Sequence, residues 1–139
     1  MIKNHYRSYE ITRKVPFYDL DPMQIVWHGN YFHYFEDARV ALFAQLGIDL
    51  YKFYSEKQYL FPIIKTYTKH IHPLRYGDEF ICKATIVEGR TMIIVDFEIR
   101  LKNDGKLCAR GRTEQAAVRA PEMEMLFTIP DEIRYALGF

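Results

Sequence analysis

The chain has 139 residues, of which 49% are hydrophobic and 27% are charged, and its formal net charge is +1. This is the length of one domain, and the composition is that of a globular protein with a buried core. The near-neutral charge argues against nucleic acid or an anionic membrane as the main partner. No run reaches the roughly 18 apolar residues of a membrane span, and the first residues lack the apolar core of a signal peptide. We therefore expect a single cytoplasmic, soluble domain over residues 1–139.

Aromatic residues make up 16% of the chain, with 11 Tyr and 10 Phe but 1 Trp. These side chains offer a large contact area at a low cost in entropy, which suits a ligand tunnel or a subunit interface. The cysteines, Cys82 and Cys108, lie in strand-like runs rather than in a disulfide or metal-binding motif. We expect both to be buried as small hydrophobic residues.

The first predicted element is a strand over residues 9–17, where apolar and polar residues alternate with a period of two. Pro16 has no backbone donor, which indicates an edge strand or the approach to its end. An acidic turn follows, with the sequence Asp19-Leu20-Asp21-Pro22. Pro22 disfavours helical geometry at the residue before it, so the next helix begins later.

A long helix is predicted from Asn30 to Gly47. Its apolar residues recur at helical spacing, namely Tyr31, Tyr34, Phe35, Ala38, Leu42 and Leu46. Asn30 suits the N-cap because its side-chain oxygen can accept from a free backbone N–H. Gly47 suits the left-handed residue that ends a helix. A helix with this many apolar residues needs a sheet to pack against.

The rest of the chain supplies that sheet. Residues 48–59 are ambiguous between a short helix and a turn, and four extended segments then cover residues 60–72, 80–86, 92–101 and 107–118. Turns separate them, of which Asn103-Asp104-Gly105 is the strongest hairpin signal. The small residues along one face of the last segment, Ala109, Gly111 and Ala117, leave room for a bulky neighbour such as the long helix.

The order of elements is thus a strand, a long helix and then four antiparallel strands, which predicts an α+β fold. A short terminal helix begins at Pro130-Asp131-Glu132, with Pro in the first turn and acidic residues near the positive end of the helix dipole. No internal repeat, low-complexity tract or linker interrupts the chain.

The stretch between the first strand and the long helix is the candidate site. It combines the carboxylate of Asp21, the apolar loop Ile25-Val26-Trp27 and the N-terminus of a helix. A helix N-terminus offers free N–H groups and a favourable dipole to a developing negative charge. The grouping therefore suggests a site for a polarised carbonyl group.

The run from Phe17 to Arg39, FYDLDPMQIVWHGNYFHYFEDAR, resembles the signature of hotdog-fold acyl-CoA thioesterases of the 4-hydroxybenzoyl-CoA thioesterase type. Three later pieces are similar to that family as well: Leu-Arg-Tyr-Gly-Asp before a strand, Asn-Asp-Gly between the last strands and a terminal Ile-Pro before a short helix. The resemblance covers nearly the whole chain. It implies a hotdog fold, in which an antiparallel sheet of about five strands wraps around a long central helix.

The resemblance also implies the roles of two residues. Asp21 falls on the family's catalytic carboxylate, which acts as nucleophile or as general base for water. His28 falls where the family's backbone N–H at the helix entrance polarises the thioester carbonyl. This role agrees with general physical chemistry, because a donor that meets the developing negative charge stabilises the transition state. One such donor typically raises the rate by roughly 10² to 10³. A poorly solvated carboxylate beside Val26 and Trp27 would also be more reactive.

The remaining expectations concern substrate and assembly. The aromatic and polar residues at the helix entrance would shape the acyl pocket, namely Trp27, Asn30, Tyr31, Tyr34 and Phe35. Lys69 and Arg90, with Arg119, could meet the phosphates of coenzyme A. The resemblance implies an acyl-CoA or acyl-carrier-protein thioester as substrate, no cofactor, no metal, and a homodimer or dimer of dimers with the site between subunits. The family's small residues after the Asp are replaced here by Pro22-Met23-Gln24, which bears on substrate preference.

Several alternatives stay open. Without the family, Asp21 reads as a turn former, His28 as a hydrogen-bonded loop residue and the aromatic stripe as core. His70 and His72 share a strand face and could bind a metal, but no third ligand is evident. A haloacid-dehalogenase-like phosphotransferase would explain Asp19-x-Asp21 but needs alternating βα units. A hotdog protein that binds acyl-carrier-protein intermediates, or hydrates an enoyl thioester, is the second alternative.

Overall fold

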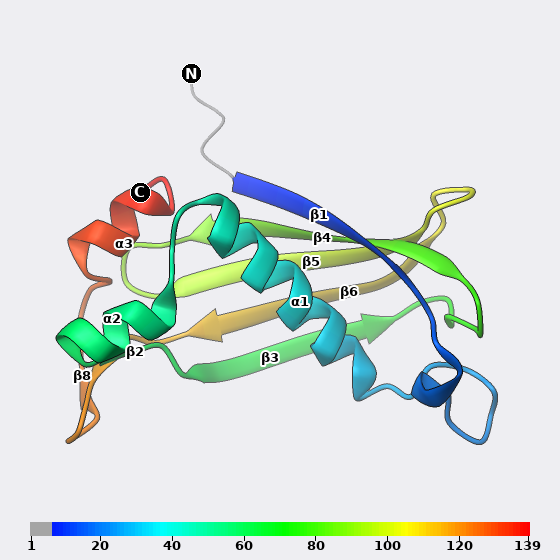
Figure 1. Cartoon of the computed structure of the whole chain (residues 1–139), viewed down its shortest axis with the longest axis horizontal. Coiled ribbons are helices and arrows are strands. Elements are labelled where there is room, and N and C mark those ends of the chain that lie inside the picture. Colours follow the sequence, from blue (N-terminus) through cyan, green and yellow to red (C-terminus); the bar gives the residue numbers. More distant parts are fainter. Residues whose placement is uncertain (1–6) are drawn as a thin grey trace.

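The computed structural model, which describes residues 7–139, is a hotdog fold in which one long helix lies across a five-stranded antiparallel sheet (Figure 1). The strand order is β1-β4-β5-β6-β3. The strands of this sheet are β1 (Arg7–Lys14), β3 (Ile63–His70), β4 (Glu79–Glu88), β5 (Ile93–Leu101) and β6 (Leu107–Gln115). The sequence-based expectation of an α+β hotdog fold is confirmed.

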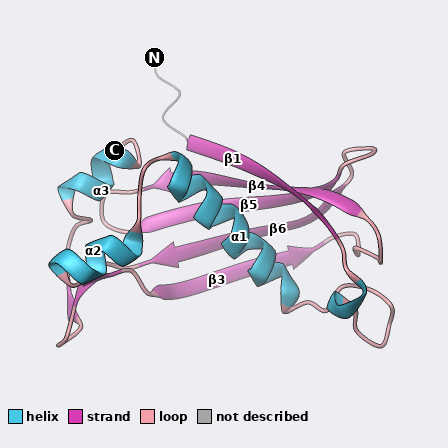
Figure 2. Ribbon diagram, viewed as in Figure 1, coloured by secondary structure: helices cyan, strands magenta, loops and turns pink. Residues whose placement is uncertain are grey.

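The helices and short strands complete the chain (Figure 2). The helices are α1 (Asn30–Gln45), α2 (Leu50–Lys57) and α3 (Asp131–Ala136), with a single 3₁₀ turn, η1, at Phe17–Asp19. A small second sheet has the order β2-β7-β8, formed by β2 (Tyr59–Leu60), β7 (Val118–Arg119) and β8 (Glu124–Met125). Helices α2 and α3 lie at one end of the main sheet, and the loop before α1 lies at the other end. No helix within residues 7–139 is long and apolar enough to cross a membrane.

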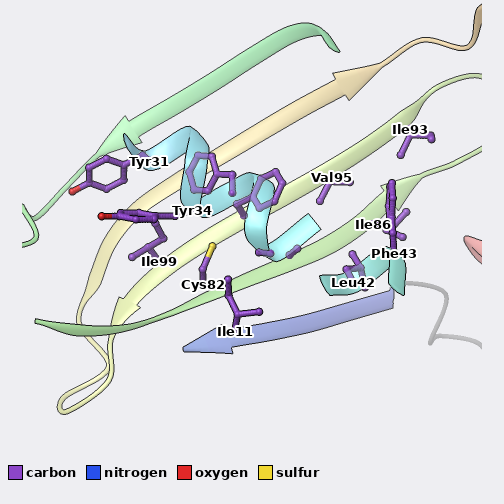
Figure 3. Close-up of a cluster of buried hydrophobic side chains, with 14 of the residues drawn as sticks. Ile11, Tyr31, Tyr34, Leu42, Phe43, Cys82, Ile86, Ile93, Val95 and Ile99 are labelled. Atoms are coloured by element: carbon purple, nitrogen blue, oxygen red, sulfur yellow. The ribbon is translucent and has the colours of Figure 1, made fainter. Parts of the chain in front are cut away.

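The core fills the space between α1 and the main sheet (Figure 3). Tyr31 and Tyr34 face the sheet near the start of α1, and Leu42 and Phe43 do so near its end. Burying such side chains contributes about 1.5 to 3 kcal/mol each. The helix is thereby fixed at both ends.

At the middle of the core, α1 approaches β6 at Gly111. A methyl group added to Gly111 would lie 2.4 Å from the ring of Phe35. That ring stacks on Phe97 of β5, with their centroids 4.6 Å apart. The prediction that small residues on this strand admit the long helix is confirmed at Gly111.

Two predicted boundaries next to the acidic turn differ from the structure. The first strand ends at Lys14 rather than at residue 17, because the chain turns into η1 after Pro16. Asn30 is the first residue of α1 and not its N-cap: Gly29 occupies that position, with no side-chain cap. The amide of Asn30 instead donates to the backbone carbonyl of Asp19, at 3.0 Å. Gly47 has a φ of +75°, as expected of the residue that follows a helix.

Strand β3 is one edge strand of the main sheet, and its outer edge pairs with no strand within residues 7–139. Four large apolar side chains along and just after it are exposed: Ile63, Ile64, Tyr67 and Ile71. An open, apolar strand edge is a ready template for pairing with another strand.

Candidate active site

A two-stranded hairpin in the loop between β1 and α1 holds the candidate catalytic residues. Leu20 and Val26 form an isolated antiparallel bridge. On one side of this bridge Asp21 N–H donates to the Ile25 carbonyl at 2.8 Å, and on the other Trp27 N–H donates to the Asp19 carbonyl at 3.0 Å. The hairpin is anchored to the fold because Val26 N–H donates to the carbonyl of Leu74 at 2.9 Å.

Asp21 begins the tight turn of this hairpin. Its carboxylate is half-buried, and Oδ1 accepts a hydrogen bond from the backbone N–H of Met23 at 2.8 Å. The other oxygen has no partner among the described residues. Gln24 closes the turn with a φ of +64°, a left-handed conformation that suits glycine and costs a residue with a side chain about 1 kcal/mol. The chain thus keeps the backbone shape of a glycine turn with a larger residue.

The N-terminus of α1 offers a free donor at His28. The first backbone donors of the helix turn inward, because Asn30 N–H donates to the Trp27 carbonyl at 2.9 Å and Tyr31 N–H to the His28 carbonyl at 3.3 Å. Within the part of the chain that the structure describes, no acceptor pairs with the N–H of His28. His28 is exposed, so this N–H is available to an external oxygen.

Asp19 is a structural residue of the site, whereas the sequence suggested only a place in the acidic turn or, in the dehalogenase-like alternative, a pair with Asp21. Its carboxylate accepts a hydrogen bond from the hydroxyl of Tyr34, at 2.6 Å. Its carbonyl accepts from both the Trp27 N–H and the Asn30 amide, each at 3.0 Å. Asp19 therefore ties both strands of the hairpin to the first turns of α1. The only signal in the sequence was its place two residues before Asp21.

The aromatic residues of α1 support the hairpin from behind. Tyr31, Tyr34 and Phe35 are all buried against the sheet, so in a single chain they are core residues rather than an open pocket wall. Burial raises the pKa of Tyr31, and burial with the Asp19 contact raises that of Tyr34, so both phenols stay protonated. The Tyr31 ring also meets His70 of β3 edge to face, with centroids 4.6 Å apart.

Trp27 is the exposed aromatic residue of the site, with 49% of its surface accessible. Its ring folds back over Gly29, where an added methyl group would lie 2.3 Å from it. The same ring lies against the imidazole of His28, with centroids 5.2 Å apart. Trp27 is therefore placed to cover a ligand at the helix N-terminus.

The predicted phosphate contacts lie apart from one another. Lys69 is exposed near the end of β3 that meets Tyr31, and it pairs in register with Arg110 of β6. Arg90 lies in the β4–β5 turn, at the opposite end of the sheet from Asp21, with its guanidinium over the ring of Phe139. Arg119 is in β7 at that same end. One chain thus brings Lys69, but neither of the two arginines, towards the Asp21 loop.

Possible metal ligands do not cluster in the described part of the chain. Within residues 7–139, no three His, Cys, Asp or Glu side chains come together as a metal site would require. Cys82 and Cys108 are both buried and unpaired in disulfides. The site thus combines the Asp21 carboxylate, the backbone N–H groups of His28 and Gly29, which have no acceptor among the described residues, and an aromatic cover. This combination suits addition to a polarised carbonyl.

Comparison with known proteins gives concordant matches. Residues 15–137 match the model of the thioesterase-like superfamily. A 1,4-dihydroxy-2-naphthoyl-CoA hydrolase of Thermosynechococcus vestitus is 33% identical over 72 residues, which is 52% of this chain and 48% of that protein. Among solved structures, a 1,4-dihydroxy-2-naphthoyl-CoA thioesterase from Synechocystis has a TM-score of 0.86 at 19% identity, covering 94% of this chain and 95% of the other. A variant of 4-hydroxybenzoyl-CoA thioesterase in complex with 4-hydroxybenzoyl-CoA has a TM-score of 0.84 at 19% identity, covering 96% and 99%.

Proposed function

Because this chain belongs to the thioesterase-like superfamily, we propose that it is a thioester hydrolase that cleaves an acyl-CoA to the free acid and coenzyme A. The relatives named as acyl-CoA hydrolases support this activity. The single observation that carries the proposal is the hairpin together with the turn that follows it, which carry the Asp21 carboxylate and the unpaired N–H of His28.

In the proposed mechanism, the Asp21 carboxylate and the His28 N–H act together on the thioester. The thioester oxygen accepts from the N–H of His28 at the start of α1, where the helix dipole favours the negative charge that develops during attack. Asp21 delivers the attacking oxygen, either as the nucleophile itself or as the base that takes a proton from water. The C–S bond then breaks and the thiolate of coenzyme A leaves. If Asp21 acts as the base, the proton that it took from water passes to the thiolate and the free acid is formed directly; if Asp21 acts as the nucleophile, water then hydrolyses the mixed anhydride on its carboxylate, which releases the free acid and regenerates Asp21.

The half-buried position of Asp21 supports this role. One oxygen is held by Met23 N–H, which orients the carboxylate, while the other is free to act. Trp27 would exclude water above the thioester and so strengthen the interaction with His28. We propose that Lys69 meets a phosphate of the coenzyme A, since it is the predicted cation nearest to this end of the sheet.

The proposed enzyme is a homodimer that pairs through β3. This strand leaves its outer edge unpaired within the described residues and carries exposed apolar side chains, so pairing with a second β3 would satisfy backbone groups and bury apolar surface together. A twofold axis makes such a pairing self-complementary. A further pairing of dimers, and a cytoplasmic location, stay predictions.

Thiol release from a panel of acyl-CoA substrates tests the proposed activity. We expect the wild type to turn over at least one of them, and Asp21→Asn to lose activity by at least about 10²-fold while it stays folded, because the shape is kept and the charge is lost. Asp37→Asn, at an exposed position on α1, is the matched control and should keep full activity.

Two outcomes would contradict the proposal. An Asp21→Asn protein as active as the wild type would remove the carboxylate from the mechanism. A wild type that is inactive on every coenzyme A ester but cleaves the matching acyl-carrier-protein thioesters would shift the activity to the alternative carrier. Inactivity on both would favour the binding or hydratase alternatives.

A further inference from the structure

Two histidine side chains beside the hairpin have no part in the mechanism above. His28 contributes only its backbone N–H to that mechanism, and His70, the last residue of β3, contributes nothing. Both side chains are exposed, and their ring nitrogens form no hydrogen bond with any described residue. Imidazole is the side chain that most often transfers protons in enzymes, so each of these rings is a candidate base or acid.

His70 is held against the start of α1 and beside the hairpin. Its ring meets the ring of Tyr31 edge to face, with the centroids 4.6 Å apart. Four residues later, the N–H of Leu74 donates to the hydroxyl of Tyr31 at 3.4 Å, and the carbonyl of Leu74 accepts from the N–H of Val26 at 2.9 Å. The imidazole therefore lies at the same end of α1 as the hairpin and the free N–H groups, on the last residue of a paired strand.

The groups packed around His70 keep its imidazole uncharged near neutral pH. Burial raises the pKa of Tyr31 on α1, and also that of Cys108 on β6, whose carbonyl accepts from the residue after His70; both side chains stay protonated and neutral. Lys69 and its register partner on β6 are charged, but neighbouring residues of a strand point to opposite faces of the sheet. Partial burial, and then the nearby His28, lower the pKa of His70 below its usual value of about 6.5. His70 is therefore unprotonated at neutral pH, as a base must be.

The two roles left open for Asp21 differ in whether they need a second base. As a base, Asp21 takes the proton from water itself. As a nucleophile, its carboxylate becomes part of a mixed anhydride and cannot accept the proton of the water that hydrolyses this anhydride. Asp19, the other carboxylate of the hairpin, already accepts from the hydroxyl of Tyr34. A neutral imidazole beside the hairpin supplies the base that the second route requires, and the first route has no use for it.

We propose that Asp21 is the nucleophile and that His70 is the general base of the second half of the reaction, where it takes the proton from the water that hydrolyses the mixed anhydride. This inference rests on the proposed thioesterase function and deepens it, because it distinguishes between the two routes and adds a catalytic residue.

The bonds and protons of this route balance. An oxygen of Asp21 bonds to the acyl carbon, and the C–S bond breaks with its electron pair on sulfur. Water then bonds to the same carbon while one of its protons moves to His70, and the C–O bond to Asp21 breaks with its electron pair on the carboxylate. In both halves, the N–H groups of His28 and Gly29 hold the negative oxygen. The proton on His70 passes to the thiolate, so the products are the free acid and coenzyme A, and water is the only co-reactant.

The variant His70→Gln tests this role, with the fastest substrate among acetyl-, octanoyl- and benzoyl-CoA. We expect a rapid burst of about one thiol per site, because the first half needs no base, followed by turnover at least about 10²-fold slower than that of the wild type. Mass spectrometry of the quenched protein should find the acyl group on the peptide that contains Asp21. Hydroxylamine, a nucleophile that needs no base, should restore thiol release. Wild-type turnover, or equally slow thiol release in every cycle with no acylated protein, would overturn the inference.

A second variant separates proton transfer from packing. His70→Phe keeps a ring against Tyr31 but has no nitrogen, so we expect the same burst and the same slow turnover as for His70→Gln. His33→Gln, at an exposed position on α1, is the matched control and should keep wild-type kinetics in both phases. A His70→Phe protein that turns over as fast as the wild type would show that the ring acts only by packing, and would overturn the inference.

The pH dependence of turnover gives an independent measurement. A protonated His70 cannot take a proton, so kcat of the wild type should fall as the pH drops, with a midpoint below about 6.5 because the pKa of His70 is lowered. This decline should be missing from the slow turnover of His70→Phe, and a decline with the same midpoint in both proteins would overturn the assignment. Failure of the proposed function would look different, with no thiol release by the wild type itself.

Discussion

The hydrogen bond between Tyr34 and Asp19 makes a testable prediction about how the catalytic hairpin is held. Tyr34→Phe removes the hydroxyl that donates to the Asp19 carboxylate at 2.6 Å and leaves the ring packed against Phe80, where the centroids are 4.7 Å apart. A hydrogen bond to a charged group contributes about 1.5 to 3 kcal/mol. For a chain of this length, that loss lowers the melting temperature by about 5 to 10 °C.

The same substitution should affect catalysis, because Asp19 also holds the backbone of Trp27 and the amide of Asn30. We expect kcat to fall more than KM rises, since a looser hairpin misplaces Asp21 relative to the N–H of His28. Thermal unfolding and thiol-release kinetics measure the two effects. Tyr18→Phe is the matched control, because this neighbouring tyrosine is exposed and its hydroxyl has no partner among the described residues. A Tyr34→Phe protein as stable and as active as the control would refute the reasoning.

Three further predictions concern single residues. Gly29→Ala should push the Trp27 ring off the helix N-terminus, because the added methyl group would lie 2.3 Å from it; the emission of this single tryptophan should shift and activity should fall, and an unchanged spectrum would contradict this. Partial burial, and then the nearby His28, lower the pKa of His70. As the pH falls below about 6.5 the unfolded chain therefore takes up a proton that the folded chain resists. His70→Gln should accordingly flatten the loss of stability seen in denaturant titrations below that pH, and a parallel pH profile would exclude the effect. Burial raises the pKa of the Cys82 thiol to about 12, so thiol reagents at pH 8 should label it only after unfolding, and rapid labelling of the native protein would show that the core opens.

Much of the fold could be predicted from the sequence because its signals are local. The period-two runs and the Asn103-Asp104-Gly105 turn predicted the strands of the main sheet, and the helical stripe predicted α1. The short sheet of β2, β7 and β8 was missed, since two-residue strands have no period to detect. Helix α2 was ambiguous for a related reason: with eight residues and none of them buried, it has little apolar pattern.

Only those residues of the candidate site that lie close together in the sequence could be predicted. Asp21, Trp27 and His28 belong to one recognisable motif, and in the structure they lie in the hairpin and in the turn that joins it to α1. The role of Asp19 depends on Tyr34, and the buried amide of Gln115 depends on the carbonyl of Phe61. These are tertiary contacts between distant residues, and no spacing along the chain encodes them.

The close approach at Gly111 has a consequence for how substitutions far from the hairpin are interpreted. Gly111 is in β6, 90 positions after Asp21 in the sequence. It nevertheless determines how closely Phe35, and with it α1, can approach the sheet. A larger residue there would lift the middle of the helix and tilt its first turn, where the His28 N–H and the Asn30 amide reside. A random mutagenesis screen for lost activity should therefore recover Gly111 beside the residues of the hairpin.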